Sequence, residues 1–427
     1  MKIEELYARF LESGKVSTDT RQIVPGSLFF ALTGEKFNAN AFAAEALQKG
    51  ASYAIVNDPK VVADSRFILV DDVLLTLQKL ARYHRSQLKI PIIGLTGSNG
   101  KTTSKELLSA VLAKKFKTYA TKGNLNNHIG VPLTLLAIDH SIEIAVIEMG
   151  ANHVGEIALL CSIANPTHGF ITNIGKAHIG TFGGFENIIR GKSELYQHLI
   201  TNDGQVFINS KDLILSNMAK RFKSPLFYPS ASDYYHAELV HADPFVVVKA
   251  ENGDTITTQI IGAYNFENIA AALCIGKYFG VDAAHAHEAI AAYTPTNMRS
   301  QVVMKGTNTI ILDAYNANPS SMRAAILNLA DMKADRKVLI LGDMFELEEE
   351  AEKEHHAIGQ LLREKDFTAA YLCGSLMQSA QREFPMAKHF FRKEDLIAEL
   401  SREPIHHSTI LVKASRGIGL ETIVDYL

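Results

Sequence analysis

The chain has 427 residues, of which 47% are apolar and 21% are charged, and its 43 Lys and Arg against 46 Asp and Glu give a formal net charge of −3. This balance excludes a disordered chain, which would need far fewer apolar residues and a larger charge excess. The near-neutral charge argues against a protein of the histone or ribosomal kind, so no nucleic-acid partner is expected. At about 150 residues per domain, the length indicates roughly three domains, or two of which one is large.

The cysteines indicate a reducing compartment. Cys161, Cys274 and Cys373 are odd in number, far apart, and form no C-x-x-C pair. This pattern favours neither a disulfide scaffold nor a structural zinc site. Residues 2–6 lack the apolar core of a signal peptide, and no apolar run approaches the about 18–20 residues that span a bilayer. We therefore expect a cytoplasmic protein with no membrane insertion.

The first part of the chain alternates short strand-like runs with helical patterns. The strand-like runs cover residues 27–32, 53–56 and 67–70. The helical patterns cover residues 41–49 and 73–87. Pro91 then disfavours helix in the residue before it, so we place the first domain boundary after residue 88.

From residue 92 the pattern becomes that of a parallel α/β sheet, in which short apolar runs alternate with longer helical segments. These runs cover residues 92–95, 144–147, 169–172 and 206–209. Near-continuous Val and Ile stretches of this kind fit strands that are buried on both faces. An alternating β stretch at 234–258 and an Ala-rich helix at 268–278 follow.

A second break falls near Pro295, and further strand runs alternate with helices beyond it. These runs cover residues 309–312, 337–341, 369–372 and 409–412. No G-x-G-x-x-G follows them, so a dinucleotide site is not indicated. The predicted fold class is α/β with three domains: a small N-terminal α/β domain at 1–88, a central P-loop-type parallel-sheet domain at 89–297, and a Rossmann-like domain at 298–427.

The strongest local signal is the segment IIGLTGSNGKTT at residues 92–103, which runs directly into a helical pattern. A strand, a Gly-rich turn and a helix N-terminus present backbone N–H groups to a phosphate. Lys101 can neutralise phosphate charge, and the Thr102 hydroxyl can ligate Mg²⁺. The generic phosphate-loop pattern fails by one residue, since Leu95 stands where its first Gly belongs. The alternative is a Gly-rich turn that only caps a core helix, but the flanking strand and helix favour a nucleoside triphosphate site.

Polar residues follow the next two predicted strands. Glu148 closes the run at 144–147, and His178 follows the run at 169–172. Ligands of open α/β sheets bind outside the carboxyl ends of the strands, so both residues belong near the phosphate loop. Glu148 is a hard oxygen ligand suited to Mg²⁺. His178 is a less usual ligand, and by itself it reads equally well as a polar loop residue.

Other chemically interesting residues carry no local signal of function. Lys192, taken alone, reads as a solvated helix lysine. The histidine pairs at 355–356 and 406–407 lack partners at metal-ligand spacing and are interpreted as surface residues.

Together these segments resemble the Mur ligase family, the ATP-dependent amide ligases of peptidoglycan precursor synthesis. The family's phosphate loop is a T-G-x-N-G-K-T variant, which accounts for the departure at Leu95. The resemblance covers all three predicted domains, and it includes Glu148, His178, Asn265, Asn268, Arg299 and Asp313.

Within the family, the chain is most similar to members that join D-alanyl-D-alanine to UDP-N-acetylmuramoyl-tripeptide. The segments that carry this likeness are residues 123–132, 148–153, 313–322 and 341–347. Residues 17–21 and 25–32 look like the family's uridine nucleotide-binding segment. Three positions depart from the pattern: Tyr264 replaces a common His, Ala39 a common Gly, and Gly191 a common Ala.

The resemblance implies a reaction, its cofactors and a set of site residues. A substrate carboxylate would take the γ-phosphate of ATP to form an acyl phosphate, which the amine of D-alanyl-D-alanine then attacks. The cofactors would be ATP and Mg²⁺, and the protein would be a monomer that acts in cell-wall biogenesis, cell shape and cell division. Arg299 and Asp313 would reach ATP when the domains close. The catalytic residues would be Lys101, Glu148, His178 and Lys192.

The same resemblance implies the binding residues. Nucleotide would contact Gly97, Ser98, Asn99, Gly100, Lys101, Thr102, Thr103, Asn265, Asn268, Arg299 and Asp313. The substrates would contact Thr20, Arg21, Asn124, Asn126, Asn127, Asn316 and Asn318. Metal ions would be held by Thr102, Glu148, His178 and a carbamoylated Lys192.

Three other interpretations stay open. A folylpolyglutamate synthetase-like ligase shares the central and C-terminal domains, but the first 88 residues argue against it. The ligase that adds the third residue of the peptide carries an Asp-Asn-Pro-Arg motif in its last domain, which this sequence lacks. A nucleotide-binding regulator or motor needs no second metal site, and it leaves His178 and Lys192 unexplained. Whether the third residue of the tripeptide is diaminopimelate or lysine also stays open.

Overall fold

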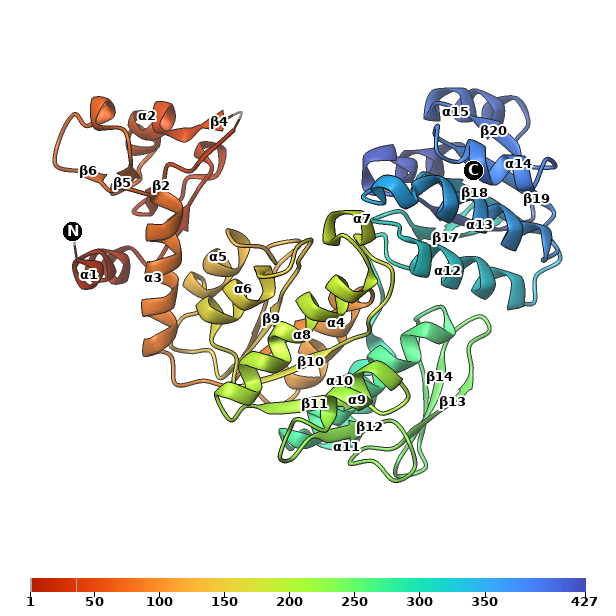
Figure 1. Ribbon diagram of the computed structural model, residues 1–427, viewed down its shortest axis with the longest axis horizontal. Helices are drawn as coiled ribbons and strands as arrows, with labels where there is room; N and C mark the ends of the chain where they lie inside the picture. The colour runs from red at the N-terminus through yellow and green to blue at the C-terminus, as the bar shows by residue number, and fades with distance from the viewer. Residues whose placement is uncertain (1, 36) are drawn as a thin grey trace.

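The computed structural model describes residues 2–35 and 37–427, which form three α/β domains (Figure 1). The N-terminal domain (α1 to α3) and the C-terminal domain (β16 to the chain end) lie at opposite ends of the central domain in this view. The predicted three-domain α/β fold is confirmed. Within the described ranges, no helix combines the length and apolar character needed to cross a membrane.

The N-terminal domain has a parallel sheet of order β1-β2-β5-β6, and α3 joins it to the central domain by packing on α5 and α6. Its elements are α1 (Ile3–Ser13), β1 (Val16–Ser17), β2 (Leu28–Phe30), β3 (Thr33–Gly34), β4 (Phe37–Asn38), α2 (Ala43–Gln48), β5 (Tyr53–Val56), β6 (Phe67–Leu69) and α3 (Val73–Gln87). The predicted helix at 73–87 is confirmed, and the Asp72 carboxylate caps it by accepting from the Leu75 N–H at 2.9 Å. The helix predicted at 41–49 begins later, because Ala39–Phe42 forms a 3₁₀ turn that Asn38 caps.

The central domain is a six-stranded parallel sheet of order β12-β11-β10-β7-β9-β8. Its strands are β7 (Ile92–Thr96), β8 (Thr118–Ala120), β9 (Ile144–Glu148), β10 (His168–Ile171), β11 (Gln205–Asn209) and β12 (Leu226–Tyr228). Its helices are α4 (Lys101–Leu112), α5 (Gly130–Leu136), α6 (Glu156–Ala164), α7 (Ile179–Phe182), α8 (Phe185–Thr201), α9 (Leu213–Ala219), α10 (Phe266–Tyr278) and α11 (Ala283–Ala292). The predicted buried strands are confirmed, whereas the short edge strands β8 and β12 were not predicted.

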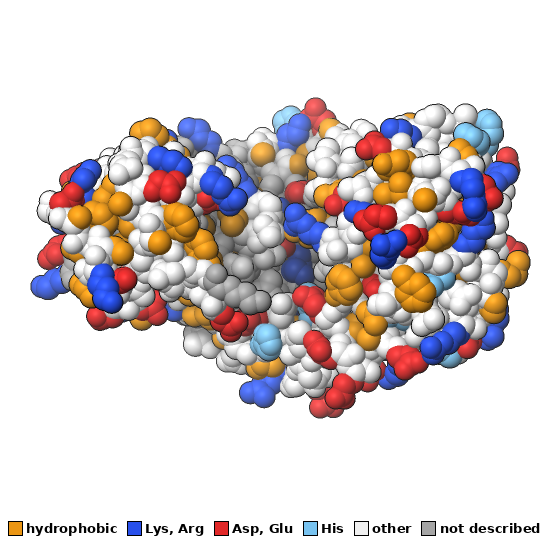
Figure 2. Space-filling model, turned by 90° about the horizontal axis from the view of Figure 1, so that it is seen from above, with side chains coloured by type: hydrophobic (Ala, Val, Ile, Leu, Met, Phe, Trp, Pro, Cys, Tyr) orange, Lys and Arg blue, Asp and Glu red, His pale blue; other side chains and the backbone are white. Residues whose placement is uncertain are grey.

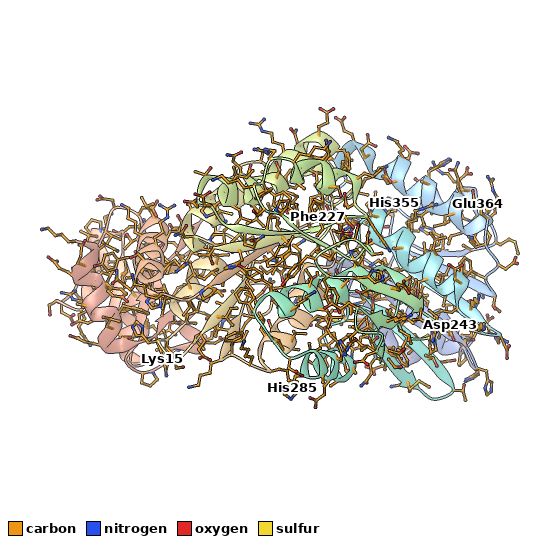
Figure 3. The ribbon with its side chains drawn as sticks, turned by 90° about the horizontal axis from the view of Figure 1, so that it is seen from below. Lys15, Phe227, Asp243, His285, His355 and Glu364 are labelled. Atoms are coloured by element: carbon orange, nitrogen blue, oxygen red, sulfur yellow. The ribbon has the colours of Figure 1, made fainter. Side chains whose placement is uncertain are left out.

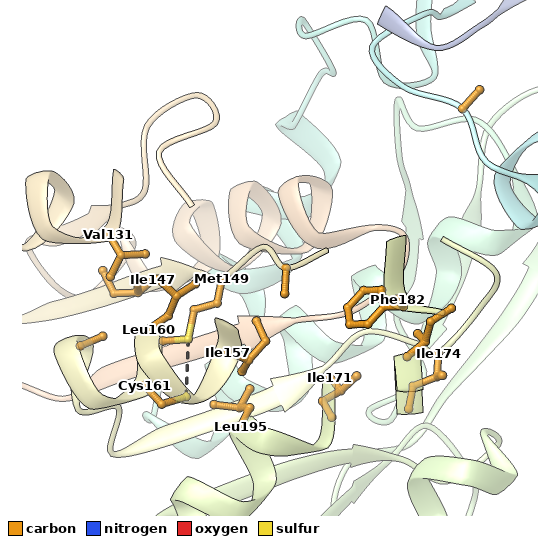
Figure 4. Close-up of a cluster of buried hydrophobic side chains, with 14 of the residues drawn as sticks. Val131, Ile147, Met149, Ile157, Leu160, Cys161, Ile171, Ile174, Phe182 and Leu195 are labelled. Atoms are coloured by element: carbon orange, nitrogen blue, oxygen red, sulfur yellow. Dashed lines mark hydrogen bonds between the residues drawn. The ribbon is translucent and has the colours of Figure 1, made fainter. Parts of the chain in front are cut away.

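Alternate residues of these strands supply the two faces of the core, as the period of two along a strand requires. Ile92 and Ile147 pack with α5, α6 and α8 on one face, while Ile93 and Val146 pack with α4 and α10 on the other. Figure 4 shows the first of these clusters, where the Cys161 thiol lies 3.7 Å from the sulfur of Met149. Burial of each such Leu, Ile or Val side chain contributes about 1.5–3 kcal/mol.

The predicted alternating β stretch forms an antiparallel sheet beside the central one. Its strands are β13 (Ala237–His241), β14 (Val247–Ala250) and β15 (Thr255–Thr257).

The C-terminal domain has a second six-stranded sheet, of order β16-β17-β21-β18-β19-β20, in which β16 is antiparallel to β17. Its strands are β16 (Gln301–Lys305), β17 (Asn308–Asp313), β18 (Lys337–Gly342), β19 (Ala369–Cys373), β20 (Lys388–Phe390) and β21 (Thr409–Lys413). Its helices are α12 (Pro319–Asp331), α13 (Ala351–Arg363), α14 (Gln378–Glu383) and α15 (Lys393–Arg402). The four predicted strands are confirmed, and each extends one residue further at its carboxyl end, so that β17 ends at Asp313 and β21 at Lys413.

The interpretation of His355 as a surface residue was wrong, because this side chain is fully buried in the C-terminal domain (Figure 3). Its Nδ1 donates to the carbonyl oxygen of Ala351 at 2.7 Å, and its Nε2 accepts from the Met344 N–H at 3.0 Å. Burial lowers the pKa of His355. Both ring nitrogens are therefore satisfied by the backbone while the ring is neutral.

The three cysteine thiols are free and buried. Burial raises the pKa of Cys161 and of Cys373 to about 12, and it raises the pKa of Cys274 as well.

Candidate functional site

The phosphate loop follows β7 at the centre of the sheet, and two glycines give it its shape. Gly97 has φ +151°, and a Cβ there would lie 1.9 Å from the Thr172 hydroxyl oxygen. Gly100 has φ +77°, and a Cβ there would lie 2.6 Å from Oδ1 of Asn268. Only glycine combines these backbone conformations with such close approaches. The loop then ends at α4, whose N-terminus presents free N–H groups.

The neighbouring loop after β10 holds the phosphate loop in place. The Ser98 hydroxyl donates to the carbonyl of Gly175 at 2.9 Å and accepts from its N–H at 2.9 Å. The Asn99 N–H donates to Oδ1 of Asn173 at 3.0 Å, and the Thr172 hydroxyl donates to the Asn99 carbonyl at 2.6 Å. The phosphate loop is therefore preorganised by polar contacts with the loop that follows β10.

The register of the sheet brings charged groups to this loop, since Leu95 of β7 pairs with Glu148 of β9. Oε1 of Glu148 accepts from the Thr102 hydroxyl at 3.3 Å and from Nδ2 of Asn126 at 2.8 Å. Its other oxygen, Oε2, is buried without a hydrogen-bond partner among the described residues. A buried carboxylate oxygen with no donor is costly unless a cation neutralises it. Oε2 of Glu148 and the Thr102 hydroxyl are both oxygen ligands of the kind that Mg²⁺ prefers.

Lys101 is positioned inside the loop itself. Its Nζ donates to the carbonyl of Gly97 at 2.7 Å and lies 3.4 Å from that of Ser98. Burial lowers the pKa of Lys101 to about 8, and nearby Arg299 adds to this effect while Glu148 opposes it.

A cavity of about 890 Å³ lies between the central and C-terminal domains and gathers most of the predicted residues. Those that line it are Ser98, Asn99, Gly100, Lys101, Thr102, Thr103, Asn124, Asn126, Asn127, Glu148, His178, Asn265, Asn268, Arg299, Asp313, Asn316 and Asn318. Thr20 and Arg21 are not among them and lie on the N-terminal domain, where the exposed Arg21 pairs with Asp19. The surface is hollowed between that domain and the rest of the molecule (Figure 2).

Two asparagines at the start of α10 support the loop from the opposite side. Nδ2 of Asn268 donates to Oδ1 of Asn265 at 2.8 Å, and Oδ1 of Asn268 accepts from the Ser104 hydroxyl at 2.9 Å. Across the domain boundary, Nδ2 of Asn318 donates to Oδ1 of Asn99 at 2.7 Å. The C-terminal domain thus contacts the phosphate loop directly.

His178 lies at the same domain boundary, in the left-handed region at φ +55°. Its Nδ1 faces the carboxylate of Glu346 from the C-terminal domain. This contact lowers the pKa of Glu346. Glu346 also has a left-handed backbone, at φ +62°, and it lines the cavity. Sequence reasoning missed this residue, because nothing local connects it with His178.

The interpretation of Lys192 as a solvated lysine was wrong, because the residue is only 1% exposed. Its Nζ donates to the carbonyl of Ala151 at 3.1 Å and lies 5.1 Å from the ring centroid of Phe182. Burial and the charge of Lys101 hold the pKa of Lys192 well below its ordinary value. The departure at Gly191 has a steric reason, since a Cβ there would lie 2.7 Å from the Phe182 ring.

Arg299 enters the cavity from the linker between the two domains. Its guanidinium lies 3.8 Å from the ring centroid of Tyr315. Asp313, at the end of β17, pairs with Lys413, and sequence reasoning missed this lysine too. The sequence feature that could have identified Lys413 is its position as a charged residue directly after the apolar run 409–412.

The described residues contain no cluster of three His, Cys, Asp or Glu side chains arranged to hold a metal ion. The groups of this site that suit Mg²⁺ are therefore the Thr102 hydroxyl and the unpartnered oxygen of Glu148. His178 lines the same cavity, whereas Lys192 is not among the lining residues and would need an added acidic group to serve as a ligand.

Comparison with known proteins agrees with this geometry. A family model described as the Mur ligase middle domain matches residues 95–276, and one described as the glutamate ligase domain of Mur ligases matches residues 298–416. A Bacillus subtilis protein named UDP-N-acetylmuramoyl-tripeptide–D-alanyl-D-alanine ligase is 35% identical, over 96% of this chain and 92% of its own length.

Two solved structures share the whole fold. MurF from Acinetobacter baumannii is 31% identical with a TM-score of 0.87, covering 96% of this chain and 92% of its own. MurF ligase from Thermotoga maritima, solved in complex with ADP, is 27% identical with a TM-score of 0.85, covering 97% of each chain. On these matches and on the site described above, the chain belongs to the Mur ligase family, whose members are ATP-dependent ligases.

Proposed function

We propose that this protein joins D-alanyl-D-alanine to UDP-N-acetylmuramoyl-tripeptide, with ATP converted to ADP and phosphate, in peptidoglycan precursor synthesis. One observation carries the proposal: a single cavity joins the phosphate loop and Glu148 to Arg299 of the interdomain linker and Asp313 of the C-terminal domain. The names of the similar proteins specify the substrates.

The reaction has two steps. An oxygen of the tripeptide carboxylate attacks the γ-phosphorus, the bond to ADP breaks, and an acyl phosphate forms. The amine nitrogen of D-alanyl-D-alanine then attacks the acyl carbon, phosphate leaves, and the amine gives up a proton. Phosphoryl transfer of this kind depends mainly on positioning and on charge neutralisation.

The residues of this chain supply both. Lys101 and the amides of the phosphate loop would bind the β and γ phosphates, and Arg299 would add positive charge beside them. Asn265 and Asn268 would contact the adenine, and Asp313 the rest of the nucleotide. Enclosure between two domains would keep water from the acyl phosphate.

Mg²⁺ is part of this proposal. Thr102 and Glu148 would hold one ion, and His178 with a carbamoylated Lys192 would hold a second. When bound, the ions screen the repulsion between the γ-phosphate and the substrate carboxylate.

The substrates would extend from this cavity toward the N-terminal domain. Thr20 and Arg21 would bind the uridine nucleotide, while Asn124, Asn126, Asn127, Asn316 and Asn318 would contact the peptide parts. We further propose domain boundaries after residues 88 and 297, a monomer, and a place in the cytoplasm.

Coupled ADP release tests the proposal. Release should require the tripeptide and D-alanyl-D-alanine together, and assays with the diaminopimelate and lysine forms should reveal which tripeptide is accepted. Lys101→Ala should abolish turnover and leave the fold intact, because it removes phosphate neutralisation and not core packing. ATP hydrolysis that needs neither substrate would instead favour a regulator or motor.

A further inference from the structure

The interdomain linker, residues 293–300 between α11 and β16, carries Arg299 and has an unusual backbone. Met298 at φ +56° and Ser300 at φ +52°, on either side of Arg299, both lie in the left-handed region without being glycine. Such conformations persist only when the surroundings determine them strongly. On the C-terminal side of Arg299, the Ser300 N–H donates to Oδ1 of Asp313 at 3.2 Å, and the Ser300 hydroxyl is hydrogen-bonded to the Tyr264 hydroxyl at 2.8 Å.

On the N-terminal side of Arg299, the carboxylate of Glu106 holds the linker. Nδ2 of Asn297 lies 2.9 Å from Oε1 and 3.0 Å from Oε2 of Glu106, and the Tyr293 hydroxyl donates to Oε2. Burial and this bond raise the pKa of Tyr293, so the tyrosine stays a proton donor. Hydrogen bonds to an ionised acceptor are stronger than those between neutral groups.

Glu106 belongs to α4, the helix that begins with Lys101 and Thr102. One rigid helix thus carries two phosphate-binding residues at its first turn and the linker's anchor one turn later. Asn297 is separated from Arg299 by a single residue, so a shift of the anchor moves Arg299 relative to the phosphates.

We propose that Glu106 is a positioning residue of the ligase reaction, which ties the interdomain linker to the phosphate-loop helix and thereby sets Arg299 against the nucleotide. This inference rests on the proposed function, in which Arg299 contacts ATP. Glu106 itself touches no reacting atom in this arrangement and acts through Asn297 and Tyr293.

A double-mutant cycle tests the proposal. Glu106→Gln should weaken ADP binding and raise the KM for ATP by about tenfold, as expected when charge-assisted hydrogen bonds are lost. In an Arg299→Ala background, the same substitution should have little further effect, because the side chain that Glu106 positions is absent. Glu288→Gln is the matched control, since Glu288 pairs at 2.8 Å with Lys114, two residues beyond the end of α4, and has no hydrogen bond or ion pair to the described residues of the linker.

A second measurement does not depend on catalysis. Trypsin should cleave after Arg299 several times faster in Glu106→Gln than in the wild type or in Glu288→Gln, at an unchanged melting temperature. Tyr293→Phe, which removes only one donor, should show a smaller increase and serves if Glu106→Gln fails to fold.

The outcomes are distinguishable. Equal effects of Glu106→Gln in the presence and absence of Arg299, or an unchanged rate of cleavage, would overturn the positioning role. A wild-type enzyme with no substrate-dependent ADP release would refute the proposed function, while the cleavage experiment would still test the anchor.

Discussion

Asp313 and Lys413 pair in register at the carboxyl ends of the parallel neighbours β17 and β21, and Nζ of Lys413 lies 2.6 Å from Oδ2 of Asp313. The lysine is only 1% exposed, and its Nζ also donates to the carbonyl of Asn316 at 3.1 Å. Since Oδ1 of Asp313 accepts from the Ser300 N–H, this ion pair supports the linker from the C-terminal side.

Lys413→Met should destabilise the protein. The substitution leaves the carboxylate of Asp313, which is partly buried at the edge of the cavity, without its cation, and the loss of such a partner costs about 1–3 kcal/mol. Urea unfolding followed by circular dichroism measures this loss. The double variant Asp313→Asn, Lys413→Met should recover part of it, because no unpaired charge remains. A wild-type unfolding midpoint for Lys413→Met would show that the pair contributes nothing to stability.

Lys192→Ala should lose most activity and regain part of it when acetate is added. The low pKa of Lys192 favours a neutral amine, whose nitrogen can bond to CO₂ with loss of a proton to give a carbamate. A carbamate offers the oxygen ligands that Mg²⁺ prefers, whereas an ammonium would repel the ion. Initial rates of ADP release with increasing acetate provide the measurement.

Lys192→Arg is the control for this rescue. Its guanidinium fills the space that acetate would occupy and keeps a positive charge, so added acid should not restore activity. Full activity of Lys192→Ala without acid would mean that the buried lysine has only a structural role.

The N-terminal domain should move toward the cavity when substrates bind. The C-terminal domain is already docked, as Nζ of Lys176 lies 2.6 Å from Oε1 of Glu354 across the boundary, whereas Thr20 and Arg21 lie outside the cavity. A nucleotide held at those residues must still reach the phosphate loop with its peptide end. Small-angle scattering should therefore show a smaller radius of gyration with an ATP analogue and tripeptide together. An unchanged radius would contradict this movement.

Acid should destabilise the protein through His168, whose ring packs against Tyr278 and Phe279 at centroid distances of 5.4 and 5.0 Å. Burial lowers the pKa of His168 to about 4, against about 6.5 in the unfolded chain. Between these values only the unfolded chain binds the proton, so stability falls as the pH drops from 6.5 toward 4. We expect His168 to account for about 2 kcal/mol of the loss between pH 7 and pH 5.

Urea unfolding at pH 7 and pH 5 measures this contribution by comparing the wild type with His168→Phe, which keeps an aromatic ring. The variant should lose less stability on acidification. His285→Gln, at an exposed position (Figure 3), should behave as the wild type does. An identical pH dependence in His168→Phe and the wild type would refute the assignment.

Local sequence patterns were sufficient for the buried parts of the fold. The central strands are apolar on both faces, so each appears as a continuous run, as in Ile92–Thr96. The edge strands β8 and β20 have only three residues each and are not fully buried, so they leave no such run. Strand β16 has five residues, as β7 does, but it escaped prediction because only three of them are apolar and none is fully buried.

Some residues of the site are likewise marked by a local sequence pattern, and others are not. The phosphate loop is a contiguous segment and could be recognised, and the positions of Glu148 and His178 after the carboxyl ends of predicted strands placed them beside it. Glu106 and Glu346 contact partners that are distant in the sequence, so no local pattern marks them, and Lys413 is marked only by its place directly after the apolar run 409–412. Lys192 was misread for a related reason, because its contacts are with Phe182 of α7 and with the carbonyl of Ala151, both outside its own helix.

The burial of all three cysteines has a practical consequence for following the motion of this enzyme. Their raised pKa values keep the thiols protonated at neutral pH, and the core shields them from reagents. A maleimide dye should therefore react only with a cysteine introduced at the surface. Placed at Glu12 and His406, both exposed and in the two outer domains, a pair of such labels would report the distance between those domains in single molecules without removal of any native cysteine.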